Sequence, residues 1–357
     1  MSFSEVSNNG VIFTKGFDSG LPVINEHFKI AERKINISST KLEKGEILVK
    51  NLYISLDLYV LSRMKSGAVK SYLGLFPIGC VLESGCISVV VKSNNDQWKE
   101  SDLYSGVSGW EEYTKISPEA AKQALPVKQY LKNSLDNGIP LSYSLGILGM
   151  PGMTAYVGLN MIGKPKKGET IFISTAAGGV GQVVGQIAKL KGLKVVGSTG
   201  DDNKVNYLIN ELKFDHAINY KKVDIGQTLK DLCPEGIDIF FDNVGGETLD
   251  KVLPILNEDA RVISCGMTSQ LNTESAYGVK NLTVIIPKSI LIQGFIVFRH
   301  YDEYHDSFQK EMLQWLKEGK LKYKENIVNG IENAPQAYLD LYNSKGFGKY
   351  SVKVSDL

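Results

Sequence analysis

Apolar side chains recur with helical spacing in the stretch 180–188. They occupy positions i, i+3, i+4, i+7 and i+8, which predicts an amphipathic helix: Val180, Val183, Val184, Ile187 and Ala188. A short apolar strand, 171–174, precedes this helix. A second apolar run, 193–196, follows Gly192, where a helix C-terminal cap belongs. The pattern predicts a strand–helix–strand unit in the middle of the chain.

Small residues fill the turn between the first strand and the helix, in the pattern Ala176-x-Gly178-x-x-Gly181. Such a turn lets the backbone approach a pyrophosphate, whose charge is held by N–H groups at the helix N-terminus. Strand, turn, helix and second strand follow one another in the required order. The sequence therefore predicts a dinucleotide site, with these residues in contact with the cofactor: Ala176, Gly178, Gly179, Val180 and Gly181.

The alternation of strands and helices continues beyond this unit. Further strands are expected at 216–220, 237–241, 261–265 and 290–297, with helical stretches between most of them. This rhythm predicts an α/β fold with a doubly wound parallel sheet. Near residue 300 the pattern changes to an amphipathic helix, marked by Phe308, Met312, Leu313 and Leu316, and a closing strand at 348–354.

Residues 1 to about 126 are β-rich. Strands are expected at 47–55, 77–82, 87–92 and 109–116, with a hairpin signal at 83–85. Several short strands with turns between them favour a barrel or sandwich. A chain of 357 residues is too long to form one compact core, so we expect two domains.

Composition narrows the function classes. The formal net charge of +1 argues against a nucleic-acid or membrane surface, and no stretch approaches the roughly 20 apolar residues of a membrane span. The N-terminus has neither a basic nor an apolar signal region, so no secretory signal is expected. The four cysteines form no CxxC pair. A reduced, cytoplasmic protein fits best.

Residues at the carboxyl ends of the strands are the candidates for ligand contact. Asn243 follows a very apolar strand and precedes two glycines, which suits either a ligand-binding loop or an ordinary Asn-Val-Gly-Gly turn. Lys204 and Tyr220 follow the second and third strands and favour NADP over NAD, because a 2′-phosphate needs a cation. Lys204 is equally readable as a surface lysine. We interpret Asp201 and Asp202 as helix N-cap residues and not as ribose acids.

Metal catalysis is not expected. Catalytic zinc needs about three His, Cys or carboxylate ligands, and the four histidines are scattered along the chain. There is no Gly-x-Ser-x-Gly elbow. The chemistry must then be carried by the cofactor.

With these motifs in place, the chain resembles the zinc-independent medium-chain dehydrogenase/reductases over nearly its full length. The match is closest to the prostaglandin/leukotriene reductases and the 2-alkenal (double-bond) reductases. The landmarks are 51–55 (Asn-Leu-Tyr-Ile-Ser), 110–113 (Trp-Glu-Glu-Tyr), 149–156 (Gly-Met-Pro-Gly-Met-Thr-Ala-Tyr), 176–181, 242–246 (Asp-Asn-Val-Gly-Gly), 292–295 (Ile-Gln-Gly-Phe) and 332–335 (Glu-Asn-Ala-Pro).

The resemblance implies a GroES-like barrel formed by 1–126 and completed by 301–357, around a Rossmann domain at 127–300. It implies NADPH as cofactor, reduction of the double bond of α,β-unsaturated aldehydes and ketones, and a homodimer. Lys204 and Tyr220 would hold the 2′-phosphate, Asn243 would contact the ribose or pyrophosphate, and Tyr53 would face the substrate. The remaining cofactor contacts would be Thr154, Cys265, Phe295, Val297, Gly346 and Gly348.

Three stretches depart from the family pattern. Leu271 replaces a tyrosine credited with a catalytic hydrogen bond, Gly346 replaces an asparagine, and 57–60 reads Asp-Leu-Tyr-Val instead of Asp-Pro-Tyr-Met. Without the tyrosine, either Tyr53 or water must supply the proton; we favour water, since a barrel tyrosine is as often core packing. A quinone reductase, and an NADPH-binding protein with little activity, are the alternative functions.

Overall fold

The computed structural model describes residues 5–66, 73–271, 273 and 275–357. The chain forms two compact units, one of Met1–Leu145 with Glu325–Leu357 and one of Gly146–Lys324. The boundaries expected from the sequence, at 126 and 300, lie closer to the N-terminus than these. Helix α3 (Leu125–Asp136) belongs to the first unit because Leu131 packs with Leu52. Helix α9 (Tyr301–Lys317) belongs to the second, where Gln309 donates to the carbonyl of Leu148.

The second unit is built on a six-stranded sheet in which every strand pair is parallel. The strand order is β11-β10-β9-β12-β13-β14. This is the order of a doubly wound dinucleotide-binding sheet, with its reversal between β9 and β12. The strands are β9 (Thr170–Ile173), β10 (Lys194–Thr199), β11 (His216–Asn219), β12 (Ile237–Asp242), β13 (Leu256–Ser264) and β14 (Leu291–Gly294). The predicted parallel α/β sheet is confirmed.

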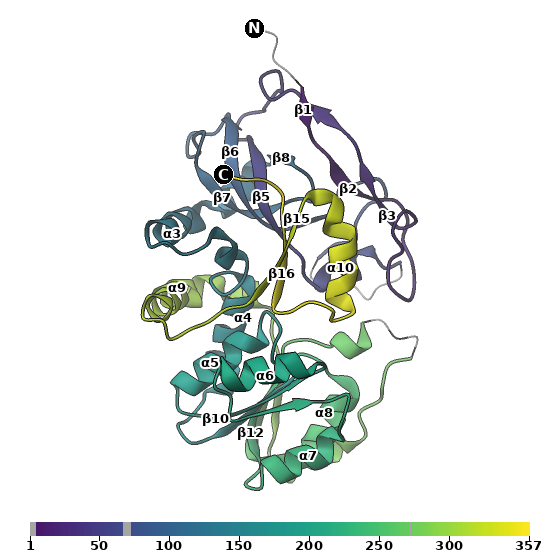
Figure 1. The fold of residues 1–357 in the computed structure, drawn as a ribbon, viewed down its shortest axis with the longest axis vertical. Coiled ribbons are helices and arrows are strands. Elements are labelled where there is room, and N and C mark those ends of the chain that lie inside the picture. The colour runs from purple at the N-terminus through teal and green to yellow at the C-terminus, as the bar shows by residue number, and fades with distance from the viewer. Residues whose placement is uncertain (1–4, 67–72, 272, 274) are drawn as a thin grey trace. The chain divides into compact units, whose positions relative to one another are not determined.

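Helices cover both faces of this sheet (Figure 1). Successive strand residues point to opposite faces. On one face, Phe172 and Phe240 stack at 5.2 Å between ring centroids and form one apolar cluster with Leu229 and Leu249. The opposite face approaches the backbone of Gly158 so closely that a Cβ there would lie 2.9 Å from the ring of Phe241. Both faces of the sheet are therefore shielded from water, which explains the continuous apolar runs of the strands.

The helices of this unit follow the predicted alternation. They are α4 (Met150–Val157), the π-helix η2 (Gly158–Gly163), α5 (Gly181–Leu190), α6 (Asp202–Asn210), α7 (Ile225–Leu232), α8 (Gly246–Val252), η3 (Leu253–Ile255), η4 (Thr268–Gln270), η5 (Asn281–Ile285), η6 (Val297–His300) and α9. Gly192 has φ of +80° just after α5, as expected of a left-handed cap. The strand predicted at 290–297 is wrong at its end, because Val297 begins η6 instead of continuing β14.

The first unit contains a mixed sheet in the order β15-β16-β5-β6-β7, with β8 also paired to β5. Two small antiparallel ribbons, β1-β4 and β2-β3, complete it. Its strands are β1 (Val6–Ser7), β2 (Gly10–Phe13), β3 (Phe28–Ala31), β4 (Lys34–Ile35), β5 (Ile47–Ser55), β6 (Glu83–Ser93), β7 (Leu103–Gly109), β8 (Tyr113–Ile116), β15 (Glu325–Asn329) and β16 (Lys349–Lys353). Its helices are α1 (Tyr59–Met64), α2 (Pro118–Gln123), α3, η1 (Leu141–Leu145), η7 (Ile331–Asn333) and α10 (Ala334–Tyr342).

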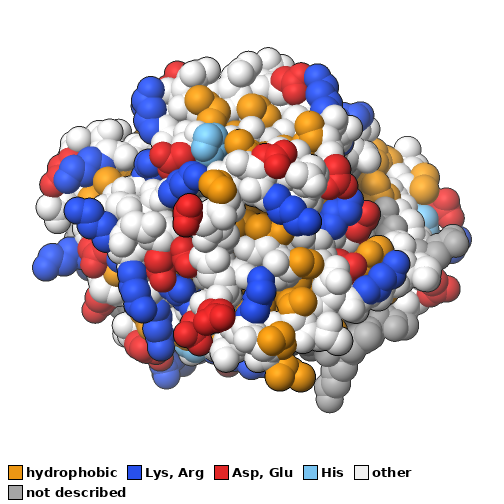
Figure 2. Space-filling model, turned by 90° about the horizontal axis from the view of Figure 1, so that it is seen from below, with side chains coloured by type: hydrophobic (Ala, Val, Ile, Leu, Met, Phe, Trp, Pro, Cys, Tyr) orange, Lys and Arg blue, Asp and Glu red, His pale blue; other side chains and the backbone are white. Residues whose placement is uncertain are grey.

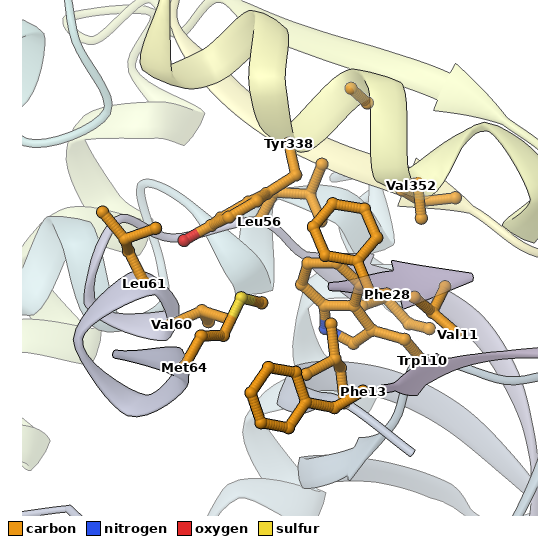
Figure 3. Close-up of a cluster of buried hydrophobic side chains, with 14 of the residues drawn as sticks. Val11, Phe13, Phe28, Leu56, Val60, Leu61, Met64, Trp110, Tyr338 and Val352 are labelled. Carbon is orange, nitrogen blue, oxygen red and sulfur yellow. The ribbon is translucent and has the colours of Figure 1, made fainter. Parts of the chain in front are cut away.

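One apolar cluster joins the two distant parts of this unit. Trp110 and Tyr338 lie edge to face at 5.5 Å, and Val352 of β16 belongs to the same cluster as Phe13 (Figure 3). The closing strand predicted from the tail is confirmed as β16, which pairs with β5 so that Val352 lies opposite Ile54. Strand β16, close to the end of the chain, is thus part of the core of the first unit.

The hairpin predicted at 83–85 is wrong. These residues begin β6 and pair with β7, so that Glu83 lies opposite Gly109. The preceding stretch, expected as a strand at 77–82, makes only a single bridge between Ile12 and Val81. The strand expected at 109–116 is split between β7 and β8. Tertiary pairing overrode the local turn signal of Glu83-Ser84-Gly85.

Positive and negative side chains are mixed on the face of the molecule that Figure 2 presents. Figure 2 shows Lys and Arg interspersed with Asp and Glu over the face it presents, with no broad field of one sign. Within the described residues, no helix is both long enough and apolar enough to cross a membrane.

A buried ion pair anchors β16. The Lys349 ammonium lies 3.0 Å from Asp57 Oδ1 and donates to the carbonyls of Leu56 and Tyr350 at 2.8 Å. The side chains of Lys349 and Asp57 are only 4% and 12% exposed. Asp57 also accepts a hydrogen bond from Ser55. Removing either partner would leave an uncompensated charge away from water.

We expect Lys349→Met to lower the free energy of unfolding by about 3 kcal/mol, because it leaves the Asp57 carboxylate without its partner charge. Lys345→Met is the matched control, since Lys345 is 64% exposed in its pair with Asp340. That change should cost less than about 1 kcal/mol. Urea unfolding of both variants measures the difference, and equal losses would contradict this role for Lys349.

Candidate nucleotide-binding site

The predicted glycine turn lies between β9 and α5, at the carboxyl edge of the parallel sheet. A Cβ on Gly181 would lie 2.4 Å from the Thr175 carbonyl oxygen and 2.7 Å from Ala176 Cα, so only glycine fits there. Within the part of the chain that the structure describes, the N–H groups of Gly179, Val180 and Gly181 donate to no backbone acceptor. The helix therefore begins with donors available to an anion.

Asp242, the last residue of β12, ties the loops of this edge together. Its Oδ1 accepts the N–H groups of Val244 and Gly245, both at 2.9 Å, and lies 3.2 Å from the hydroxyl of Ser174 at the end of β9. The carboxyl group is fully buried, and burial raises its pKa despite these hydrogen bonds. Asp242 thus shapes the turn that follows it instead of meeting a ligand.

Asn243 is held beside the glycine turn. Its amide nitrogen donates to the carbonyl of Ser174 at 2.7 Å, and its backbone N–H donates to the Ser174 hydroxyl at 2.8 Å. Gly245 and Gly246 then adopt φ of +67° and +53°, which side chains rarely tolerate. The Asp-Asn-Val-Gly-Gly stretch is therefore both a turn that requires glycine and a fixed support for Asn243 at the switch point of the sheet.

A cavity of about 390 Å³ opens at the ends of β13 and β14. Cys265 and Phe295, two of the predicted cofactor contacts, line it. Burial, and secondarily the charge of Asp242, raise the pKa of the Cys265 thiol to about 12, so this thiol stays protonated near neutral pH. The complete lining is Ser264, Cys265, Gly266, Met267, Gly294, Phe295, Ile296 and Arg299.

The other residues of this unit that are predicted to contact the nicotinamide end of the cofactor are buried or partly buried. The Thr154 hydroxyl donates to the carbonyl of Met150 at 2.7 Å, and Val297 is buried. Phe295 lies against η2, since a Cβ on Gly158 would be 3.0 Å from its ring. Thr154 and Val297 are thus buried, and of these three residues Phe295 alone lines the cavity.

Cationic groups gather at the tip of β10. A Cβ on Gly200 would lie 3.0 Å from both the Tyr220 hydroxyl and Lys221 Cε, so these two side chains converge over Gly200. Burial lowers the pKa of Lys204, Asp201 opposes that shift, and the charge of Lys221 adds to it. The ammonium groups of Lys204 and Lys221 are thus close enough to repel each other. An anion bound between them would relieve that repulsion.

The N-cap prediction is confirmed for Asp201 and wrong for Asp202. Asp201 Oδ1 accepts the N–H groups of Asn203 and Lys204 at 2.8 and 3.3 Å. Asp202 instead forms an ion pair with Lys222. Lys221 was missed from the sequence, although it stands next to Tyr220 at the end of a predicted strand.

Three predicted site residues belong to the first unit. Tyr53 is partly buried in β5 and packs against the apolar cluster of Leu52 and Leu131. Gly348 has φ of +77°. The unusual Gly346 has a packing reason, because a Cβ there would lie 1.7 Å from the hydroxyl of Tyr350. The contacts of Gly346 and Gly348 with a cofactor, and of Tyr53 with the substrate, stay predictions.

The loop that carries Leu271 is tied to the second unit. The Ser269 hydroxyl donates to the carbonyl of Val244 at 2.7 Å. Tyr277, the tyrosine nearest in sequence after Leu271, donates its hydroxyl to Asp250 at 2.8 Å. Tyr277 is therefore engaged elsewhere and does not replace the hydroxyl that Leu271 lacks. Residues 64–74, a loop that we expect to affect the shape of the substrate pocket, lie partly outside the described residues.

No metal centre is assembled from the residues described: none of their His, Cys, Asp and Glu side chains form a group of three placed to hold an ion. All four cysteines are free. The chemistry available at the sheet edge is thus backbone donors, an anchored amide and a cluster of cations. These groups suit a dinucleotide with an additional phosphate.

Two family models match the chain. One, described as the N-terminal domain of oxidoreductase, covers residues 19–125, and the other, described as zinc-binding dehydrogenase, covers residues 179–318. A zinc-type alcohol dehydrogenase-like protein of Schizosaccharomyces pombe is 44% identical over 98% of this chain and 99% of its own.

Two further matches bear on the ligand. The NADP(+)-dependent 2-alkenal reductase of Nicotiana tabacum is 41% identical over 98% of both chains. The crystal structure of CurA from Vibrio vulnificus in complex with NADPH superposes with a TM-score of 0.84 at 35% identity. That match covers 98% of this chain and 100% of the CurA chain.

Proposed function

The chain belongs to the medium-chain dehydrogenase/reductase family, in its alkenal and enone reductase subgroup, and from this premise we propose that it reduces the carbon–carbon double bond of α,β-unsaturated aldehydes and ketones with NADPH. The near-full-length match to the tobacco 2-alkenal reductase carries this proposal. The sheet edge supports it, because Gly181 admits no side chain and three N–H groups at the helix start donate to no backbone acceptor among the described residues.

NADPH supplies a hydride when it is bound. The chain's own residues would position it: Gly179, Val180 and Gly181 offer N–H groups to the pyrophosphate, and Asn243 is fixed beside them by Ser174. Phe295 and Val297 offer an apolar wall to the nicotinamide. Positioning of this kind supplies a large part of catalysis where the cofactor carries the chemistry.

We propose that the reaction needs no zinc, although one matching family model is described as zinc-binding. Support comes from the scattered histidines and from the raised pKa of the Cys265 thiol, since a zinc ligand must be a thiolate. A cytoplasmic location fits the four free cysteines.

We also propose a homodimer. β14 is the edge strand of the sheet, with Leu291 at 45% exposed, and Ile286 just before it is 85% exposed. An unpaired edge with exposed apolar side chains is a ready interface for a second copy. Light scattering would give the mass of a dimer, and a monomeric mass at micromolar concentration would refute this.

The direct test of the reaction is NADPH consumption with 2-hexenal, with a benzoquinone and with no acceptor, each in the presence of EDTA. We expect turnover with the alkenal to exceed turnover with the quinone at least about tenfold in kcat/KM, a difference of about 1.4 kcal/mol. A faster quinone reaction would make the protein a quinone reductase. If NADPH is consumed with neither the alkenal nor the quinone, only a nucleotide-binding role remains.

Cofactor choice tests the cationic cluster. NADPH should bind at least about tenfold tighter than NADH, because only NADPH carries the 2′-phosphate. Lys204→Ala and Lys221→Ala should each weaken the binding of NADPH and leave the affinity for NADH nearly unchanged. Lys222→Ala is the matched control, since Lys222 is already paired with Asp202.

Fluorescence titration of bound NADPH and NADH measures these affinities. If the two cofactors titrate equally in the unmodified protein, the 2′-phosphate site is not where we place it. If Lys222→Ala weakens NADPH as much as Lys221→Ala, the effect is one of general charge and not of a built site.

The proton is the remaining chemical question. Hydride addition leaves an enolate, and Leu271 offers no donor. Tyr53 is packed against apolar side chains, and none of the hydrogen bonds among the described residues involves its hydroxyl. We therefore propose that water protonates the α-carbon. Tyr53→Phe should lower kcat for alkenal reduction less than about tenfold.

Steady-state kinetics of Tyr53→Phe decide this point, with NADPH affinity measured alongside. A hundredfold loss of kcat with unchanged NADPH binding would make Tyr53 the proton donor and would exclude water in that role.

A further inference from the structure

The glycine turn between β9 and α5 receives a hydrogen bond from a residue far along the chain. Tyr323 donates its hydroxyl to the carbonyl oxygen of Gly179 at 3.3 Å. Within the described residues, no backbone N–H donates to that carbonyl. The turn needs support of this kind, because its first residue, Thr175, has φ of +52°, a left-handed conformation that β-branched residues rarely adopt.

This hydrogen bond acts on one of the donors of the nucleotide turn. The carbonyl of Gly179 and the N–H of Val180 belong to the same peptide group, which is planar and trans. The two bonds therefore point to opposite sides, so a hydroxyl held at the carbonyl oxygen directs the Val180 N–H away from Tyr323. That N–H donates to no backbone acceptor among the described residues. A hydrogen bond to the carbonyl also polarises the peptide group and makes its N–H a better donor to an anion.

Two buried glutamines hold the backbone on both sides of Tyr323. Gln182 and Gln186 lie four residues apart on α5 and so share one face of the helix. Gln186 Nε2 donates to the carbonyl of Lys322 at 2.8 Å, and its Oε1 accepts the N–H of Lys322 at 2.7 Å. Gln182 forms the same pair of bonds with Lys324, at 3.1 and 2.9 Å. Tyr323 cannot shift along α5 without breaking these four bonds.

The ring of Tyr323 is held as well. A Cβ on Gly146 would lie 2.4 Å from Tyr323 Cε1 and 2.7 Å from its hydroxyl oxygen, so the ring lies directly against the backbone of Gly146. Tyr323 is itself buried. Because its backbone is anchored and its ring is packed, its hydroxyl has little freedom to lose when a ligand binds to the turn.

We propose that Tyr323 is a positioning residue for the nucleotide, which orients the Gly179–Val180 peptide so that the Val180 N–H faces the pyrophosphate. This inference rests on the proposed function and adds to it a residue outside the glycine motif. Tyr323 takes no part in hydride transfer. The pyrophosphate is common to NADPH and NADH, so Tyr323 serves both cofactors equally, whereas Lys204 serves only the one with a 2′-phosphate.

Three ligands test the proposal in Tyr323→Phe, which removes the hydroxyl and keeps the ring. We expect NADPH and NADH to bind more weakly by the same factor, about fivefold, as for the loss of one neutral hydrogen bond. The affinity for adenosine 2′-monophosphate should stay within about twofold, because this ligand has the 2′-phosphate and no pyrophosphate. Lys204→Ala should give a different pattern, with weaker binding of NADPH and adenosine 2′-monophosphate and an unchanged affinity for NADH. Calorimetry measures all of these affinities.

Tyr277→Phe is the matched control, since it makes the same change in the same unit and the Tyr277 hydroxyl donates to Asp250 instead of to the glycine turn. It should leave the affinities for the three ligands unchanged. An equal loss for all three ligands in Tyr323→Phe would mean that Tyr323 only supports the fold. Unchanged affinities for both dinucleotides would mean that it does not orient the turn. Either result would overturn the proposal.

Turnover separates this inference from the proposed reaction. In Tyr323→Phe the KM for NADPH should rise about fivefold, while kcat at saturating NADPH stays within about twofold. A loss confined to kcat would place Tyr323 in the chemistry and contradict the proposal. If Tyr323→Phe weakens both dinucleotides and the unmodified protein reduces no alkenal, the reaction is wrong and the role of Tyr323 stands. If the alkenal is reduced and Tyr323→Phe binds both dinucleotides as tightly as the unmodified protein, the reaction stands and the role of Tyr323 is wrong.

Discussion

One carboxylate oxygen organises the nucleotide edge of this protein. Asp242 Oδ1 receives two backbone N–H groups from the turn after β12 and lies within hydrogen-bond distance of the Ser174 hydroxyl at the end of β9. The two strands are neighbours at the point where the strand order reverses. Because Ser174 in turn accepts the N–H of Asn243 and anchors its side chain, the same contact fixes the amide beside the glycine turn. The network holds this edge through Oδ1 alone, since Asp242 Oδ2 is buried and has no hydrogen-bond partner among the described residues.

Much of the second unit could be predicted from the sequence. Apolar runs buried on both faces and the spacing around Gly181 predict a parallel sheet with a nucleotide turn, and both depend on local patterns. The hairpin expected at 83–85 failed because those residues pair with β7, a long-range choice that a turn signal does not reveal. β15 was missed because its strand-like pattern is short and its partner β16 lies beyond a helix.

The candidate site was predictable where it depends on backbone geometry and less so where it depends on side-chain convergence. Lys204 and Tyr220 were predicted from their places after two strands, whereas Lys221 was recognised only from the side chains that meet above Gly200.

The central claim, that hydride reaches the carbon–carbon double bond, is tested most directly by isotope transfer. NADPH with deuterium at both hydrogen positions of the nicotinamide C4 would be incubated with the protein and 2-hexenal, and the product examined by NMR and mass spectrometry. We predict hexanal with one deuterium on its β-carbon. An allylic alcohol with deuterium on the former carbonyl carbon, or recovery of unlabelled 2-hexenal, would contradict the proposed function.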